Sequence, residues 1–491
     1  MDGQTVLYRG SLKSCNYRCA YCPFSKHPVS DRELKRDKEQ WSSFVRTFPE
    51  KFRESKSRAL LVVPYGEALI HPWYWEGLGQ ISASDQVEAV GAQTNVSFSV
   101  QDSLDIYIKA GGELRKLRIW ATFHPQMTTT QVFAETCRQL MDAGVLLCAG
   151  AVGVPENISM IRELRKMLPG EIYLWINQMD GLKRRYTKEE TEAFLEIDPY
   201  FLRELLPFPA DPSRCRGRIF VEGNGKVRTC NIGTIQEQPA LTCSRKLCSC
   251  YLAYGGRSDF MNRVLFGPYP AFRIPRRPEA AFFDIDGTLI PHGVSSEKYT
   301  VSEDILAGLA ALSKERTRLF FATSLPVKEA MKRCDQINHL FSGGIFAGGA
   351  HLLWQEGEQK KELFYFLDES CLKELKAIKE KLSVRILTCR QGGRIYKITL
   401  CRPAHSFWSS QDIKTVEDTL AGIKDGSLRC FAEDHCLQIV SAQATKAEGL
   451  NTLCRWMGIS PSQAAAAGDS EEDEEMMRIC ESSGSPLATS I

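Results

Sequence analysis

Three cysteines near the start of the chain have a spacing that suits metal chemistry. Cys15, Cys19 and Cys22 form a C-x3-C-x2-C pattern, and Tyr21 directly precedes the third thiol. Three thiolates on one short loop can bind three irons of a cubic 4Fe–4S cluster, which leaves the fourth iron without a protein ligand. Such an open iron can chelate a small molecule through its amino and carboxylate groups. The alternative is a structural zinc loop that takes a fourth ligand such as His27.

The cysteine spacing, with an aromatic residue before the third thiol, resembles the radical S-adenosylmethionine (radical SAM) superfamily. The resemblance implies that Cys15, Cys19 and Cys22 hold a 4Fe–4S cluster and that SAM is a second cofactor. One electron from the cluster would break a C–S bond of SAM and release a carbon radical. The resemblance also implies that Tyr21 lies at the cofactor site.

A second segment of the same resemblance follows an apolar run. Gly66 and Glu67 in Tyr65-Gly-Glu-Ala resemble the family's Gly-Gly-Glu segment, which holds the amino group of the methionine moiety. Tyr65 replaces the first glycine, so only Gly66 and Glu67 carry over. The alternative for each of the other candidate positions is an ordinary polar group of a loop. These other candidate cofactor contacts are Asn95, Thr122 and Val152.

Further cysteines cluster beyond residue 207, where the composition changes. Turn-forming residues 222–225 separate two strand-like runs, which predicts a β-hairpin. The segment resembles the auxiliary-cluster extensions of some radical SAM proteins, so four of its thiols could hold a second 4Fe–4S cluster or a zinc ion. The alternative is a cysteine-rich cap without metal. The thiols concerned are Cys215, Cys230, Cys243, Cys248 and Cys250.

A different chemistry is indicated where an apolar run ends in two carboxylates. The segment Ala280-Ala-Phe-Phe-Asp-Ile-Asp-Gly-Thr-Leu289 resembles the haloacid dehalogenase (HAD) superfamily, in particular its phosphatases. In that chemistry Asp284 attacks phosphorus and forms an aspartyl phosphate. Asp286 protonates the leaving oxygen and later activates water, while Gly287 permits a sharp turn.

Three later segments match the same superfamily in the order that it requires. Thr323 ends a second apolar run and would bind a phosphoryl oxygen, with Ser324 as the runner-up. Lys446 would offset the phosphate charge. Residues 468–473 resemble the acidic Gly-Asp-x-x-Asn-Asp loop, although Glu472 stands where asparagine is usual. Carboxylates of this kind suit Mg²⁺, and the expected ligands are Asp284, Asp286, Asp469 and Asp473.

Apolar runs that alternate with helix-like stretches would position the first set of residues. Repeated strand–helix units predict parallel strands covered by helices, and six such units fit a partial (β/α)6 barrel of the radical SAM type. The HAD resemblance implies a Rossmann-like core with an α+β cap, similar to the Cof-type phosphatases. The expected strands of the barrel are Val6–Arg9, Leu60–Pro64, Ala89–Ala92, Leu117–Ala121, Val145–Val152 and Ile172–Asn177.

These patterns divide the chain into an α/β protein with several domains. We expect the barrel at 1–206, the cysteine-rich extension at 207–265, and a proline-rich extended linker at 266–279. The HAD core is expected at 280–349 and 431–491, with the cap at 350–430.

Composition limits the function further. The chain has 491 residues, a net charge of +2 and 43% apolar residues, which is typical of a multidomain globular protein rather than a nucleic-acid-binding one. Without a signal-like N-terminus or a long apolar run, we expect no membrane span and a cytoplasmic location. The eighteen cysteines would then be reduced, which favours metal ligation over disulfides.

Two catalytic halves on one chain suggest consecutive steps. We expect a bifunctional enzyme whose radical SAM half transforms a small phosphorylated metabolite, a nucleotide or a sugar phosphate, while the HAD half removes phosphate. The expected partners are that substrate and a reductase or flavodoxin-type electron donor. One alternative is a peptide or protein maturase with an accessory phosphatase. Another is a HAD domain that only binds a phosphorylated ligand and regulates the first half.

Overall fold

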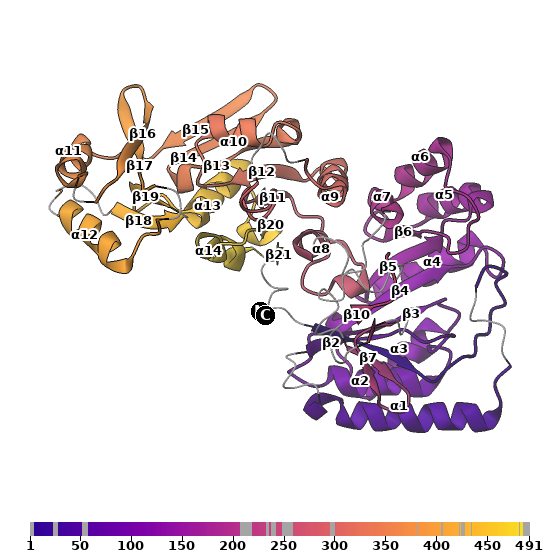
Figure 1. The fold of residues 1–491 in the computed structure, drawn as a ribbon. Helices are drawn as coiled ribbons and strands as arrows, with labels where there is room; N and C mark the ends of the chain where they lie inside the picture. The colour runs from indigo at the N-terminus through magenta and orange to yellow at the C-terminus, as the bar shows by residue number, and fades with distance from the viewer. Residues whose placement is uncertain are drawn as a thin grey trace. The chain divides into compact units, whose positions relative to one another are not determined.

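The protein forms two compact units, Met1–Arg276 and Arg277–Ile491, each with its own sheets (Figure 1). The structure is a computed structural model. It describes residues 4–22, 28–51, 57–206, 219–231, 235–236, 242–247, 259–294, 300–380, 382–403, 406–421, 423, 428–433, 435–480 and 482–484.

The N-terminal unit is built on an eight-stranded sheet with the order β6-β5-β4-β3-β2-β1-β7-β8. Each of the six expected strands overlaps an observed one, and all six pair in parallel in chain order. The described strands form an open sheet with β6 and β8 at its edges, and no closed barrel is found among them. The six parallel strands are β1 (Gln4–Gly10), β2 (Ser57–Val62), β3 (Ala89–Thr94), β4 (Leu117–Phe123), β5 (Leu146–Val152) and β6 (Tyr173–Asn177).

Helices connect these strands and cover one face of the sheet. Because every crossover leads to the next strand in the same direction and such crossovers are right-handed, the helices are placed on the same side. The first helix shows why it packs there: Trp41, Phe44, Val45 and Phe48 recur at helical spacing and are buried against that face. The connecting helices are α1 (Asp31–Lys51), α2 (Pro72–Ser82), α3 (Val100–Lys109), α4 (Thr130–Asp142) and α5 (Ile158–Met167).

The opposite face of the sheet is covered by a segment for which the sequence predicted an extended linker. After α8 (Asp259–Phe266), the chain continues through the short 3-10 helix η5 (Pro270–Phe272). The guanidinium of Arg273 lies 4.8 Å from the ring of Trp120 and 4.6 Å from that of Trp175. Arg273 is fully buried and forms an ion pair of 2.8 Å with Glu204. The prediction of an extended linker is therefore wrong for residues 266–273. The sequence of this segment lacks a helical period, but that does not show whether the segment packs against the sheet.

The C-terminal part of this unit contains shorter elements. The helices α6 (Lys188–Ile197) and α7 (Phe201–Leu205) follow β6. β7 (Ile219–Glu222) pairs in parallel with β1 and antiparallel with β8 (Val227–Arg228), which confirms the predicted hairpin. A separate two-stranded ribbon joins β9 (Ile235–Gln236) to β10 (Thr242–Cys243).

The C-terminal unit contains a seven-stranded sheet with the order β15-β14-β13-β12-β11-β20-β21. Its parallel strands are β11 (Ala280–Phe283), β12 (Arg318–Ala322), β13 (Phe341–Phe346), β20 (Ala464–Ala467) and β21 (Ser482–Gly484). The antiparallel strands β14 (His351–Glu356) and β15 (Gln359–Phe364) complete one edge. The connecting helices are α9 (Glu303–Lys314), α10 (Val327–Arg333), α13 (Lys446–Met457) and α14 (Glu471–Ile479). This is the Rossmann-like core.

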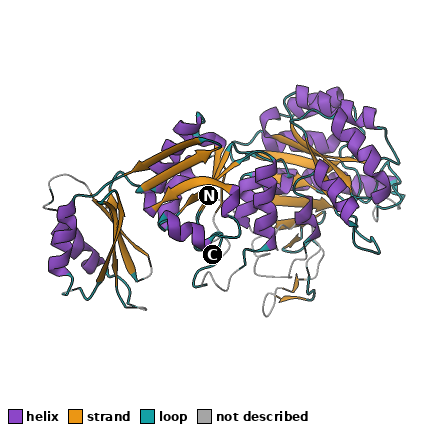
Figure 2. Ribbon diagram, turned by 90° about the horizontal axis from the view of Figure 1, so that it is seen from above, coloured by secondary structure: helices purple, strands orange, loops and turns teal. Residues whose placement is uncertain are grey.

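A second, four-stranded antiparallel sheet is inserted in the C-terminal unit, with α11 (Glu369–Ile378) and α12 (Ser410–Leu420) along one face (Figure 2). We refer to this sheet and its two helices as the cap. Its limits differ from the expected 350–430: residues 351–364 belong to the core sheet, and 436–441 belong to the cap. Alternating apolar residues indicate that a segment is a strand, but they do not indicate which sheet the strand joins. The expected limits of the cap therefore differ from the observed ones. The cap strands are β16 (Arg385–Gln391), β17 (Arg394–Cys401), β18 (Leu428–Glu433) and β19 (Cys436–Ser441).

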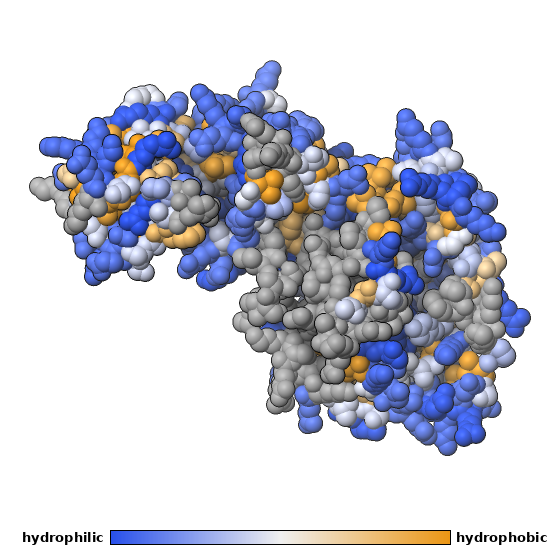
Figure 3. Space-filling view, in the orientation of Figure 1, coloured by the Kyte–Doolittle hydropathy of each residue, from blue (hydrophilic) through white to orange (hydrophobic). Residues whose placement is uncertain are grey.

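The described surface is mainly hydrophilic on the face that Figure 3 shows, with apolar residues in small separate groups. In the described part of the chain, no helix is long and apolar enough to cross a membrane.

Candidate active site

The predicted phosphatase residues meet at the carboxyl ends of three neighbouring strands. Phe283 at the end of β11 pairs with Phe321 of β12 and with Ala467 of β20. The next residues along these strands are Asp284, Thr323 after Ala322, and Asp469 after Gly468. Parallel strands end at the same edge of a sheet, so this topology places residues that are far apart in sequence in one site.

Lys446 lies between two carboxylates in this site. Its Nζ atom donates to Oδ1 of Asp284 at 2.8 Å and to Oδ1 of Asp473 at 2.7 Å. All three side chains are buried. Lys446 is the first residue of α13, whose N-terminus is capped by the hydroxyl of Thr445, and this cap fixes where the lysine enters the site.

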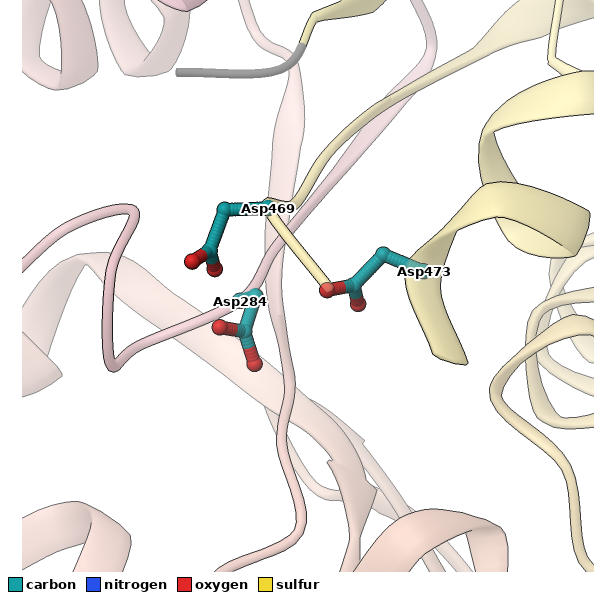
Figure 4. A group of neighbouring side chains, drawn as sticks. All are labelled: Asp284, Asp469 and Asp473. Carbon is teal, nitrogen blue, oxygen red and sulfur yellow. The ribbon is translucent and has the colours of Figure 1, made fainter. Parts of the chain in front are cut away.

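Asp469 completes a group of three buried carboxylates. One carboxylate oxygen from each of Asp284, Asp469 and Asp473 lies within 4.8 Å of the others, and the three side chains converge in Figure 4. Asp469 also accepts a hydrogen bond of 3.3 Å from Thr288 and lies 2.7 Å from Nε2 of His292. Three oxygen donors at this spacing suit a hard divalent cation.

The electrostatics of the group follow from its burial. Burial raises the pKa of Asp284 well above its usual range, although Lys446 acts in the opposite direction. Burial by itself would lower the pKa of Lys446, but Asp284 and Asp473 raise it above the ordinary value. Lys446 is therefore held as a cation between the two carboxyl groups. A bound divalent cation would add to this positive charge.

Asp286 is followed directly by a tight turn at Gly287. Gly287 has φ of +89°, and a Cβ atom there would lie 2.1 Å from Oδ2 of Asp469, so only glycine fits. The carboxylate of Asp286 accepts a bond of 2.7 Å from Nε of Arg333, which also forms an ion pair of 2.5 Å with it. Arg333, the last residue of α10, thus orients Asp286.

Thr323 is buried at the end of β12, and its Oγ1 atom accepts the backbone N–H of Leu325 at 3.1 Å. Its neighbour Ser324 contributes its carbonyl oxygen to Lys397 of the cap strand β17. A second cap residue, Arg429 of β18, forms an ion pair with Glu472 of the acidic loop. The cap therefore contacts two of the loops that carry predicted site residues.

Sequence reasoning missed several residues of this site. Arg333, His292, Lys397 and Arg429 belong to none of the motifs that identified the others. Arg333 reaches the site through α10, Lys397 and Arg429 through the cap, and His292 through the loop that follows β11. The glutamate at position 472 was one available signal, because an additional, half-buried carboxylate in this loop favours a cationic partner.

In the N-terminal unit, three of the predicted cofactor residues, Gly66, Glu67 and Asn95, contact the loop that carries Cys15, Cys19 and Cys22. The backbone N–H of Glu67 donates to the carbonyl of Ser14 at 2.8 Å. A Cβ atom at Gly66 would lie 1.8 Å from the same carbonyl oxygen, so glycine is required for this approach. Burial and the neighbouring thiols Cys22 and Cys15 raise the pKa of Cys19 to about 11.

Glu67 is buried and extensively hydrogen-bonded. Its Oε1 atom accepts the backbone N–H of Leu69 at 2.9 Å and the hydroxyl of Thr94 at 2.8 Å, and Oε2 accepts the N–H of Asn95 at 2.6 Å. Burial nevertheless raises the pKa of Glu67 to about 7. The amide of Asn95 reaches Sγ of Cys15 at 3.8 Å, which links this carboxylate to the cysteine loop.

The remaining predicted cofactor residues are Tyr21, Thr122 and Val152. The hydroxyl of Tyr21 lies 2.9 Å from Nδ1 of His124, just beyond β4. Thr122 pairs with Gly150 across β4 and β5, and Val152 ends β5 opposite Asn177. Thr122 and Val152 occupy strand ends at the same edge as Asn95, without a described contact to the cysteine loop.

Two of the five cysteines in the second group, Cys230 and Cys243, lie in the described part of the chain. Cys243 lies on β10, opposite Ile235 of β9, and Cys230 follows β8. Both are half-buried. Cys215, Cys248 and Cys250 lie outside the described residues, as does His27, the alternative ligand of the first loop.

Comparisons with known proteins concern the C-terminal unit. Residues 378–484 match a family of haloacid dehalogenase-like hydrolases, and this range includes Lys446, Asp469 and Asp473. No match was found among curated proteins.

Several solved structures are similar to parts of the chain. One is a sugar phosphatase of HAD subclass IIB, at 19% identity over 41% of this chain and 85% of the other, with a TM-score of 0.35. Another is a haloacid dehalogenase-like hydrolase from Bacteroides thetaiotaomicron, at 18% identity over 42% and 86% of the two chains, with a TM-score of 0.34. A third, from B. subtilis, has 16% identity over 41% and 87%, with a TM-score of 0.33.

Proposed function

We propose that the C-terminal unit, which contains a haloacid dehalogenase-like hydrolase domain, hydrolyses a phosphate ester of a small metabolite. The observation that carries this proposal is the buried group at the strand ends. Asp284 is within 2.8 Å of Lys446 and shares its surroundings with the carboxylates of Asp469 and Asp473. A protein that only bound phosphate would not require a nucleophilic carboxylate and a second one, Asp286, two residues later.

In the proposed reaction, Asp284 attacks phosphorus and the bond between phosphorus and the ester oxygen breaks. Asp286 gives its proton to that oxygen, so the leaving group departs as an alcohol. Asp286 then takes a proton from a water molecule as the water attacks phosphorus. The bond to Asp284 breaks, phosphate leaves, and both carboxyl groups are restored.

The site also fits Mg²⁺, which the HAD family uses. Asp284, Asp469 and Asp473 are oxygen donors within 4.8 Å of one another, the ligand type that this cation prefers. When bound, Mg²⁺ would offset the negative charge of the phosphoryl group. Lys446 supplies a further positive charge, and the hydroxyl of Thr323 would orient a phosphoryl oxygen.

Phosphate release from a panel of phosphate esters tests this proposal. We expect Mg²⁺-dependent release by the wild type and a decrease of about 1,000-fold or more in Asp284→Asn, because the nucleophile is lost. Asp418→Asn removes an exposed carboxylate of the cap and is the matched control. Release that is absent in the wild type, or equal in Asp284→Asn, would contradict a phosphatase.

We further propose that the N-terminal unit is a radical SAM enzyme. The supporting observation is the hydrogen-bonded path from Glu67 through Asn95 to Cys15. The three thiols lie on one short loop, and burial together with Cys22 and Cys15 raises the pKa of Cys19 to about 11. A 4Fe–4S cluster would bind their sulfur atoms as thiolates. When bound, the 4Fe–4S cluster and SAM would supply a carbon radical. Glu67 would accept a hydrogen bond from the amino group of SAM, and Asn95 would orient the loop.

Anaerobic iron and sulfide analysis tests the second proposal. We expect about four irons per chain at the first loop and their loss in the triple variant Cys15→Ala/Cys19→Ala/Cys22→Ala. About four additional irons that survive in the triple variant would assign a second cluster to the Cys215–Cys250 segment. Zinc in place of iron would contradict the radical proposal and leave a structural zinc loop.

We also propose that the two units form a bifunctional enzyme and that it acts in the cytoplasm. In this proposal the N-terminal unit transforms a nucleotide or sugar phosphate by radical chemistry, with electrons from a flavodoxin-type donor, and the C-terminal unit removes phosphate. Recovery of a peptide precursor with the purified protein would instead favour a maturase. A C-terminal unit that binds phosphate esters without hydrolysing them would favour a regulatory role.

A further inference from the structure

The cap carries a buried lysine that the proposed reaction does not use. Lys397 lies on β17 with only 3% of the residue exposed. Its ammonium group donates to the backbone carbonyl of Ser324, in the loop that follows β12 of the core. Among the described residues, no carboxylate lies within ion-pairing distance of Lys397. An ammonium group has three donors, so this single bond leaves part of its capacity unused.

Arg429, a second cation of the cap, differs from Lys397 because groups of the protein itself compensate its charge. The Arg429 guanidinium forms an ion pair with Glu472 and donates to the carbonyl oxygens of Gly348 and Ala444 at 2.9 and 2.8 Å. Its charge is therefore compensated within the protein. Lys397 has no comparable partner: burial lowers its pKa below the ordinary value, and the opposing effects of Glu433 and Glu329 do not offset that burial. Burying an unpaired charge is unfavourable unless another group compensates it.

The position of Lys397 indicates which ligand would compensate it. Ser324 directly follows Thr323, the predicted ligand of a phosphoryl oxygen, and β12 is the neighbour of the strand that carries Asp284. In the proposed reaction, Lys446 would face the transferred phosphoryl group from the core side, and Asp284, Asp469 and Asp473 would hold Mg²⁺ there. Lys397 comes from the cap strand β17, and its bond to the Ser324 carbonyl brings its ammonium group beside the loop that carries Thr323.

We propose that Lys397 binds a second anionic group, a carboxylate or a phosphate, on the leaving-group part of the substrate. The inference rests on the proposed phosphatase function and narrows its substrates to esters with an additional negative charge. A charge-assisted hydrogen bond from a buried ammonium to such a group is stronger than one from a hydroxyl. The carbonyl of Ser324 would orient the lysine while the substrate supplies the missing negative charge.

Two esters of similar size test the proposal: 6-phosphogluconate, which carries a carboxylate, and glucose 6-phosphate, which does not. We expect the wild type to have a kcat/KM about tenfold higher for 6-phosphogluconate. Lys397→Met should remove most of this preference and Lys397→Arg should retain part of it. Lys376→Met, which removes an exposed lysine of the same cap, should leave it unchanged.

The ratio of the two kcat/KM values separates binding from folding. A variant that folds poorly loses activity toward both esters equally, so its ratio stays at the wild-type value. An unchanged ratio in Lys397→Met, or a wild type without preference for the charged ester, would overturn the proposed role of Lys397 while leaving the phosphatase intact. A wild type that releases phosphate from no ester would contradict the phosphatase function itself, and this inference with it.

Discussion

Lys446 is the residue on which the charge balance of the candidate phosphatase site depends. It is buried, and both Asp284 and Asp473 accept hydrogen bonds from its ammonium group. Replacing it with methionine would leave two buried carboxylates without a cation. We expect Lys446→Met to lower the free energy of unfolding by about 3 to 5 kcal/mol when divalent cations are chelated, measured by urea denaturation.

A second variant distinguishes this electrostatic cost from lost packing. Lys446→Met/Asp473→Asn removes one of the two unpaired charges, so we expect it to regain part of the stability but none of the phosphatase activity. Equal stability of the single and double variants would show that the cost of Lys446→Met has another origin.

Asp198 is a buried carboxyl group in the N-terminal unit whose titration should be visible in stability. It accepts hydrogen bonds from the hydroxyl of Tyr173 and the backbone N–H groups of Ile176 and Tyr200. Burial still raises its pKa to about 7, from 3.8 in the unfolded chain. Between these values the folded state holds a proton that the unfolded state has lost, so stability decreases as the pH rises from about 4 to about 7.

We therefore expect the unfolding free energy of the wild type, relative to Asp198→Asn, to decrease by on the order of 3 kcal/mol between pH 4 and pH 8. The difference between the two proteins is the relevant quantity, because other groups titrate equally in both. Urea denaturation at several pH values measures it. A difference that is constant with pH would mean that Asp198 titrates normally.

At the scale of elements, the cap contains two cysteines on facing strands. Cys401 of β17 and Cys436 of β19 are direct partners, with their sulfur atoms 2.9 Å apart. Burial and the neighbouring Cys401 raise the pKa of Cys436 to about 12, so little thiolate is present at neutral pH. The pair is therefore expected to be reduced in a reducing compartment and to join slowly under oxidation.

We expect a mild oxidant to join Cys401 to Cys436 and to stabilise the cap by about 2 to 4 kcal/mol. Peptide mapping by mass spectrometry under non-reducing conditions detects the cross-link. Cys436→Ser should prevent it, whereas Cys430→Ser, a half-buried cysteine on the neighbouring strand, should not. If the oxidant modified other cysteines before it joined Cys401 to Cys436, the expected preference for this cross-link would be contradicted.

The elements differ in how well the sequence predicts them, for identifiable reasons. The six parallel strands of the N-terminal unit were found because each is an apolar run between polar stretches. β20 consists of Ala464–Ala467, a residue type that favours helices, and it is a strand because it fits between β11 and β21. β20 was predictable because it directly precedes the acidic segment 468–473, and not because of the strand propensity of alanine.

Other parts required tertiary information. The limits of the cap were misplaced because the strands at 351–364 look like cap strands in sequence and pair with β13 instead. The buried position of Arg273 depends on Trp120, Trp175 and Glu204, which are distant along the chain. At the phosphatase site, the motif residues were predictable, whereas Arg333 and Lys397 depend on how α10 and the cap pack.

At the scale of the whole molecule, the chain has two compact units with separate hydrophobic cores. The cysteine loop and Glu67 belong to the first, and Asp284 and Lys446 belong to the second. Substitutions that share no contacts generally have independent effects. We therefore expect substitutions at the candidate site of one unit to leave the candidate site of the other unit unaffected.

Two variants and two assays test this independence in the full chain. Asp284→Asn should abolish phosphate release but keep the iron content and the formation of 5′-deoxyadenosine with SAM and dithionite. The triple variant of Cys15, Cys19 and Cys22 should lose both of these and retain phosphate release from a simple ester. If the triple variant also lost phosphate release while its C-terminal unit remained folded, the units would be coupled, and the C-terminal unit would depend on the cluster for its function. If each variant lost only its own activity, the chain would join two catalysts that work independently. The order of their reactions would then be set by the chemistry of the substrate.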